Sequence, residues 1–193
     1  MSVEVGRDGC VAVRDGEFGV CVDPSGEVDE AAVVLLTCAS RSDLDIEGLK
    51  KACGRGTCVV MPNALRDESL PCRDIEYLGP GDVLDVYGVR IRSLGTEEGL
   101  GYRFVLGDSS FYVTGKSGLS ESFIELENTV DMAFVQADHR SVDLDDIVGS
   151  AVRLKPSVLV PYFSGDSPVN LENLKADLED RSISVEVPSL EES

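Results

Sequence analysis

The sequence is poor in the residues from which many functional sites are built. Its 193 residues include one histidine, His139, so it encodes no metal centre made of several imidazoles. Lysine and arginine together number 17 against 36 aspartates and glutamates, which gives a formal net charge of −19. Such a surface repels nucleic-acid phosphate and anionic lipid, and neutralising phosphate is the main source of nucleic-acid affinity. We therefore expect neither a nucleic-acid nor a membrane partner.

Long apolar runs are also absent. The longest run, Ala31 to Leu36, is far shorter than the roughly 20 residues that a transmembrane helix needs. The first residues contain neither a basic segment nor an apolar signal core, so we expect a cytoplasmic protein. A hydrophobic content of 42% and the chain length fit one folded domain, which we place at residues 1–189 with a short acidic tail at 190–193.

Lysine is scarce among the basic residues, with five in the whole chain. Many carboxylates combined with few lysines suit a cytosol of very high salt. There the screening length is about 3 Å at 1 M, so self-repulsion costs little while the charge keeps the protein dispersed. We expect a salt-adapted protein; an ordinary acidic protein with an acidic tail is the alternative.

The six cysteines all lie within the first 72 residues. A reducing cytosol and the size of the chain argue against a disulfide framework. Several cysteines take the place of an apolar residue within a strand pattern, so we interpret them as free, buried thiols. The segment from Cys53 to Cys58 resembles no zinc motif, and we interpret it as a helix end, a glycine turn and a strand start.

Strand and helix patterns alternate along the chain in a definite order. Asp15-Gly16 between two alternating segments indicates a hairpin, and the all-apolar stretch at 32–36 is typical of a strand covered on both faces. Strands are expected at 3–5, 10–14, 17–22, 32–36, 57–61, 74–78, 83–86, 89–93, 102–106, 110–114, 132–135, 158–160 and 183–187. Helices are expected at 46–52, 120–128, 144–154 and 171–178. The order predicts an α/β protein with two packed sheets and helices outside.

Five passages, in the right order, carry a family resemblance. They are a hairpin with an Asp-Pro stop at 9–24, a strand and loop at 33–45, a turn and hairpin at 79–91, a strand pair at 101–115 and a strand ending in proline at 154–163. Together they resemble the metallo-β-lactamase fold, in its branch of small lactonase-like hydrolases. The resemblance spans nearly the whole chain and implies a four-layer αββα sandwich of two mixed sheets.

In that family, histidines and aspartates at strand ends hold one or two zinc or similar ions. The metal activates a bound water that attacks an ester, amide or phosphoester. The corresponding positions of this sequence are occupied by other residues, and we treat them as vestigial. They are Cys38, Ser40, Ser42, Asp43, Lys116 and Phe163, with Asp45 close behind. A shifted alignment puts Leu44 at the last histidine position of the first motif and does not restore that motif.

Lys116 is the most informative of these positions. An ammonium group where a bridging carboxylate belongs repels a dication by several kcal/mol at intermediate dielectric. The same ammonium can stand in for the lost cation. We therefore expect Lys116 to pair with Asp43 or Asp45 in the former metal pocket; a lysine that points into solvent is the alternative.

The resemblance then implies a metallo-β-lactamase-like protein that has lost its metal ligands and needs no cofactor. We interpret it as a non-catalytic binding or regulatory relative, whose partner is an unidentified protein or small molecule. The alternative is a hydrolase of esters, lactones or phosphoesters. Its metal site would be rebuilt from Cys38, Asp43, Asp45 and Glu97 or Glu98, or it would use Cys38 as a metal-free nucleophile beside Lys116.

Overall fold

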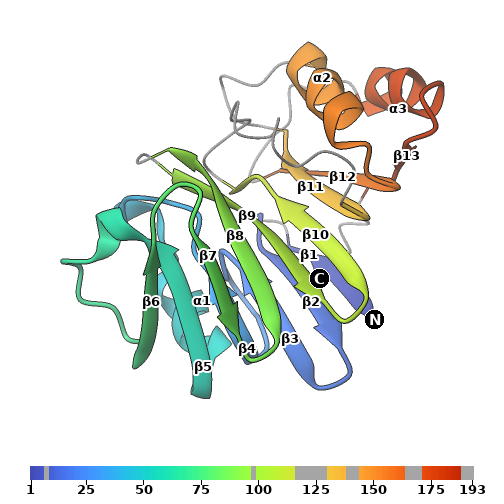
Figure 1. Cartoon of the computed structure of the whole chain (residues 1–193). Coiled ribbons are helices and arrows are strands. Elements are labelled where there is room, and N and C mark those ends of the chain that lie inside the picture. Colours follow the sequence, from blue (N-terminus) through green and yellow to red (C-terminus); the bar gives the residue numbers. More distant parts are fainter. Residues whose placement is uncertain (7–8, 97–98, 116–129, 138–143, 164–170, 188–193) are drawn as a thin grey trace.

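The structure is a computed structural model that describes residues 1–6, 9–96, 99–115, 130–137, 144–163 and 171–187. Within these ranges the strands form one six-stranded and one seven-stranded sheet. The sheets lie face to face, with one helix outside the first sheet and two helices outside the second (Figure 1). This arrangement confirms the predicted α/β fold of two mixed sheets with flanking helices.

The first sheet has the order β1-β2-β3-β4-β5-β6. Its strands are β1 (Ser2–Val5), β2 (Val11–Asp15), β3 (Phe18–Val22), β4 (Ala31–Leu35), β5 (Cys53–Pro62) and β6 (Asp74–Leu78). Strands β1 to β3 form an antiparallel meander, and β3 to β6 are parallel to one another. Helix α1 (Ile46–Ala52) follows the short turn η1 (Arg41–Asp43), and a second turn, η2 (Asn63–Leu65), follows β5.

The second sheet has the order β13-β12-β11-β10-β9-β8-β7. Its strands are β7 (Val83–Val86), β8 (Val89–Thr96), β9 (Gly99–Leu106), β10 (Ser109–Val113), β11 (Met132–Gln136), β12 (Val158–Tyr162) and β13 (Ser184–Val185). Strands β7 to β10 are antiparallel, and β10 to β13 are parallel. Helices α2 (Leu144–Leu154) and α3 (Leu171–Glu179) cover β11 to β13 (Figure 1).

The main core lies between the two sheets. Alternate residues of the strands point inward, as in Val11 and Val13 of β2, which are both fully buried. In the second sheet Phe104 and Phe111 stack with their ring centroids 5.2 Å apart. Leu49 of α1 belongs to a second cluster outside the first sheet, and the apolar faces of α2 and α3 form a third outside the second sheet. The alternation of side chains along each strand therefore determines which face of a sheet packs against the other sheet and which face the helices cover.

Two local predictions are wrong. The segment that begins at Cys53 is not a glycine turn, because β5 starts there and pairs with β4 through a register shift between Ala31 and Val33. Strand β12 does not end before Pro161. Leu159, two residues earlier, accepts a hydrogen bond from Glu186 on the β13 side. Pro161 faces the same side, beyond the end of β13, where no backbone donor is needed.

The other element predictions agree within a few residues wherever the structure describes them. The predicted helix at 120–128 and the acidic tail at 190–193 lie outside the described residues. The assignment of 1–189 to one domain stays a prediction. Among the described residues, no helix has both the length and the apolar character needed to cross a membrane.

Candidate functional site

The candidate site lies where both sheets present the carboxyl ends of parallel strands. In the first sheet, β3 runs into Asp23 and β4 into Thr37; in the second, β10 runs into Thr114 and β11 ends at Gln136. Within the second sheet, the backbone N–H of Gln136 donates to Thr114 Oγ1 at 3.0 Å. Parallel strands place their carboxyl ends on one edge, and in open α/β sheets this edge is the usual location of ligand sites.

Asp23 and Thr37 tie the ends of β3 and β4 together. The Thr37 backbone N–H donates to Asp23 Oδ1 at 2.8 Å, and the Thr37 hydroxyl donates to Asp23 Oδ2 at 2.5 Å. Thr37 is fully buried, and Asp23 adopts the left-handed conformation with φ +45°. Both carboxylate oxygens of Asp23 therefore accept hydrogen bonds from the neighbouring strand end.

The two sheets approach each other closely at this edge. Gly115, which follows β10, has φ +55°, and a Cβ atom on it would overlap the Thr37 side chain. The fully buried Tyr102 of β9 donates its hydroxyl to the backbone oxygen of Leu36 at 2.8 Å. Burial raises the pKa of the Tyr102 phenol, which keeps it protonated as a donor. The Tyr102 hydrogen bond and the close approach of Gly115 to Thr37 thus connect the end of β4 with β9 and β10.

A cavity of about 210 Å³ opens beside these strand ends. It is lined by carboxylates and an amide at its polar parts and by leucine, proline and tyrosine elsewhere. The lining residues are Gly9, Asp23, Pro24, Ser25, Leu36, Asp43, Leu44, Asp45, Gln136 and Tyr162. They come from β11 and β12 of the second sheet and from the segments that follow β1, β3 and β4 of the first sheet. We call this cavity the strand-end pocket.

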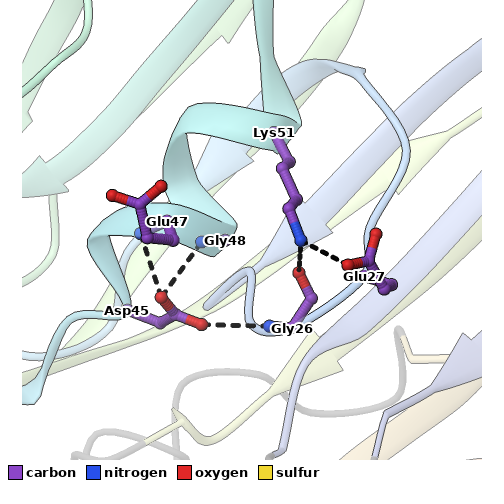
Figure 2. A network of polar contacts seen from close by, with 6 residues as sticks. All are labelled: Gly26, Glu27, Asp45, Glu47, Gly48 and Lys51. Carbon is purple, nitrogen blue, oxygen red and sulfur yellow. Dashed lines mark hydrogen bonds and ion pairs between the residues drawn. The ribbon is translucent and has the colours of Figure 1, made fainter.

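Asp45 in this pocket has a structural role that its geometry explains. As the N-cap of α1, it accepts hydrogen bonds through Oδ1 from the backbone N–H groups of Glu47 and Gly48, each at 3.0 Å. Its Oδ2 accepts from the backbone N–H of Gly26 at 3.0 Å, as Figure 2 shows. The hydrogen bond from Gly48, followed by that from Gly26, lowers the pKa of the Asp45 carboxyl. Beside it, Lys51 pairs with Glu27 at 2.6 Å (Figure 2).

Comparison with solved structures identifies the architecture. The chain aligns over 98% of its length with 98% of a protein of Parabacteroides distasonis assigned as a metal-dependent hydrolase, with a TM-score of 0.78 and 17% identity. It aligns over 98% of its length with 98% of a protein of Thermotoga maritima assigned as a zinc-dependent hydrolase of the metallo-β-lactamase superfamily, with a TM-score of 0.65 and 14% identity. The chain has the metallo-β-lactamase fold.

A third structure gives the same result. Igni18, a metallo hydrolase of the archaeon Ignicoccus hospitalis, has a TM-score of 0.77 and 14% identity, with 98% of this chain and 95% of that chain aligned. No family model and no curated protein matches the sequence. The predicted metallo-β-lactamase-like architecture is therefore confirmed by structure, at identities that show the fold alone.

The residues that the family resemblance matches to metal ligands are placed as follows. Cys38 is buried, and its backbone forms a β-bridge with Gly99. Ser40 and Ser42 lie 2.8 Å apart between their hydroxyl oxygens, and the Ser42 hydroxyl donates to Asp43 Oδ1 at 3.3 Å.

Phe163 packs against the apolar cluster beneath α2 and α3. Lys116, Glu97, Glu98 and His139 lie outside the described residues. The pairing of Lys116 with Asp43 or Asp45 therefore stays a prediction.

Among the described residues, those that the resemblance matches to metal ligands do not fit the metal centre that the fold family implies. Hydroxyl groups are poor zinc ligands, and a phenyl ring has no donor atom. The carboxylates of Asp23 and Asp45 already accept hydrogen bonds through both oxygens. Within the described ranges, no three histidine, cysteine, aspartate or glutamate side chains gather closely enough to hold a metal ion. The described strand ends supply hydrogen-bond acceptors rather than a converging set of ligands.

Sequence reasoning placed Asp43 and Asp45 near this edge but did not assign Asp23, Thr37 or Gln136 to the site. The Asp-Pro pair after β3 by itself predicts only the end of a strand. A polar residue that directly follows an apolar strand was the available signal for all three, because such residues fall at the carboxyl edge.

Proposed function

We propose that this chain is a non-catalytic relative of the metallo-β-lactamase-fold hydrolases that binds a small polar molecule in the strand-end pocket. The observation that carries this proposal is that the Asp23 and Asp45 carboxylates at the strand ends are engaged in hydrogen bonds with the protein. Asp23 accepts hydrogen bonds from Thr37 at the end of β4. Asp45 accepts hydrogen bonds from the first turn of α1 and from Gly26, so both carboxylates bind protein groups rather than a common ion. These hydrogen bonds link the strand ends, and a cavity of about 210 Å³ lies beside them.

The lining supports a ligand of particular chemistry. Asp43 and Gln136 place acceptor oxygens at the polar part of the pocket, while Leu36 and Leu44 supply an apolar wall. The volume is below the ~300–1,000 Å³ of sites for drug-sized molecules. A metabolite with N–H or O–H donors and a short apolar portion matches this lining. Binding of such a molecule gives the protein a sensing or regulatory role without turnover.

A hydrolase with a rebuilt metal site is the second candidate, since the compared structures are assigned as metal-dependent hydrolases. Such a site would combine Cys38, Asp43 and Asp45 with Glu97 or Glu98. The engagement of Asp45 with three backbone N–H groups weighs against it, because ligation would uncap α1. The burial of Cys38, at 2% exposed, weighs against a thiolate nucleophile that has to reach a substrate.

Ligand-observed NMR tests binding directly. The chain is screened at low and at molar salt against small amines, polyols and carboxylates. We expect saturation transfer to amines or polyols but not to carboxylates, because the pocket presents acceptor oxygens. Asp43→Asn weakens this signal, whereas Asp180→Asn, at an exposed position after α3, leaves it unchanged. Absence of any pocket ligand from the screen, or equal effects of both variants, counts against the proposal.

An activity screen separates the two candidates. We expect no hydrolysis of lactones, phosphodiesters or thioesters above the uncatalysed rate. Hydrolysis that Cys38→Ala or Lys116→Ala abolishes would replace the proposal with the hydrolase.

A further inference from the structure

Two cysteines on the outside of the first sheet form a close thiol pair. The Sγ atoms of Cys53 and Cys72 lie 3.4 Å apart, and both side chains are half-buried. Cys53 is the C-cap of α1 and the first residue of β5. Cys72 belongs to the loop that connects η2 to β6. The pair is thus at the opposite end of α1 from Asp45 and outside the strand-end pocket.

The chain contains a natural comparison pair. The Sγ atoms of Cys10 and Cys21 are 3.5 Å apart, nearly the same separation. These two side chains are only 4% and 2% exposed, within the cluster under α1. Accessibility therefore distinguishes two thiol pairs of similar geometry, and thiol oxidation follows thiolate character and exposure.

We propose that Cys53 and Cys72 are a redox-modification site, a dithiol that low-molecular-weight disulfides convert to a protein disulfide. The sulfurs need to approach each other by about 1.4 Å to reach the ~2.0 Å of a disulfide bond. The loop that carries Cys72 is contacted by Arg41 of η1, which donates to the backbone oxygen of Ser69, and the nearby Arg66 lies over the Tyr77 ring of β6. Bond formation requires this loop to shift by about the same small distance. This inference does not depend on the proposed function of the pocket.

The reaction is a balanced exchange in two steps. The Cys72 thiolate attacks one sulfur of the small disulfide, forms a mixed disulfide and releases one small thiolate. Cys53 then gives its proton to that thiolate and attacks Cys72 Sγ, which forms the Cys53–Cys72 bond and releases the second small thiolate. This thiolate takes up the proton that Cys72 lost on ionising. Two protein thiols are oxidised and one small disulfide is reduced to two thiols.

The order of attack follows from the hydrogen bond between the two sulfurs. The thiol of Cys53 lowers the pKa of Cys72, and the same hydrogen bond raises the pKa of Cys53. We therefore expect Cys72 to become a thiolate first and Cys53 to act as the resolving thiol.

Peptide mapping of the whole chain after exposure to oxidised glutathione tests the proposal. We expect a linked peptide pair that contains Cys53 and Cys72, a loss of two of the six free thiols and reversal by a small dithiol reductant. Because the bond closes a loop of about 20 residues, we expect it to raise the melting temperature by roughly 5–10 °C. Cys72→Ser abolishes both effects, and Cys10→Ser leaves both unchanged.

Three results would overturn the inference. Peptide mapping of the wild-type chain detects each of them, so the test does not depend on how well a variant folds. One is linkage of Cys10 to Cys21 before linkage of Cys53 to Cys72. Another is glutathione retained on Cys72 without resolution by Cys53. The third is a complete lack of reaction at both residues.

Discussion

At the scale of single residues, Asp45 connects two segments of the fold. Its carboxylate accepts three backbone hydrogen bonds and joins the start of α1 to the Gly26 turn. Loss of an N-cap side chain costs about 0.5–2 kcal/mol, and here the bond to Gly26 is lost as well. We expect Asp45→Ala to lower the free energy of unfolding by about 1–2 kcal/mol at pH 7, as measured by urea denaturation. An unchanged midpoint would contradict this role.

The same residue gives a pH dependence with a defined sign. The backbone hydrogen bonds hold the pKa of Asp45 below its ordinary value of 3.8 in the folded chain. The ionised carboxylate therefore stabilises the fold above pH 3.8, and this contribution is lost as the pH falls through the lowered pKa. We expect the stability difference between the wild type and Asp45→Ala to shrink below pH 3.8. For Asp45→Asn, which cannot ionise at this position, a capping contribution independent of pH is expected.

Gly115 gives a second test at the residue scale. Gly115 and Gly16 both have positive φ, at +55° and +62°, but only Gly115 faces a neighbour, Thr37. Gly16→Ala lowers the free energy of unfolding only by the cost of the left-handed conformation, about 1–2 kcal/mol. Alanine at Gly115 also forces apart β4 and β10, so we expect a loss of about 3 kcal/mol or more. Similar unfolding midpoints for the two variants would show that the sheets do not meet there as described.

At the scale of elements, helices α1 and α2 each contain a glycine, but the space around the two glycines differs. A Cβ on Gly48 of α1 would lie 2.7 Å from the backbone of Pro24 and Ser25, whereas nothing lies within 4 Å of a Cβ on Gly149 of α2. We expect Gly149→Ala to stabilise the chain by about 0.5–1 kcal/mol through helix propensity. Gly48→Ala instead destabilises it by about 1–3 kcal/mol, because the clash exceeds that gain. Thermal denaturation of both variants tests this difference. Melting temperatures that shift in the same direction in both variants would refute it.

Most elements were predictable because their signals are local. The helices at 46–52 and 144–154 and the strands at 74–78 and 83–86 are found at the predicted residues, bounded by caps and turn residues. The start of β5 was not, because Gly54 and Gly56 favour a turn while pairing with β4 decides the outcome. Strand β13 is shorter than predicted, since its pairing with β12 ends at Val185. Tertiary pairing overrides local preference at both places.

The candidate site was predictable only in part. The family resemblance singles out Asp43 and Asp45, and both line the strand-end pocket. The hydrogen bonds of Asp23 with Thr37 join segments that the linear pattern treats separately, so only the folded chain reveals them. The same holds for the thiol pair of Cys53 and Cys72, which lies across 19 positions of the sequence.

At the scale of the whole molecule, the excess of negative charge is the main feature. The chain has a net charge of −19, and its accessible surface is 9816 Å². The screening length falls from about 10 Å at 0.1 M salt to about 3 Å at 1 M, which reduces repulsion among the carboxylates. We expect the melting temperature to rise by several degrees between 0.1 M and 2 M potassium chloride. Sucrose at equal osmolality is the control, and an equal rise in sucrose or no rise in salt would contradict salt adaptation.

The central claim is that the carboxylates of Asp23 and Asp45 connect the strand ends and turns of this chain through hydrogen bonds, without a metal ion. The most direct test is metal analysis of the chain purified without chelator, before and after addition of zinc, iron or manganese. We predict far less than one ion per chain in both samples and no change in melting temperature. A stoichiometric ion that Asp43→Asn removes and Cys72→Ser retains would contradict the account.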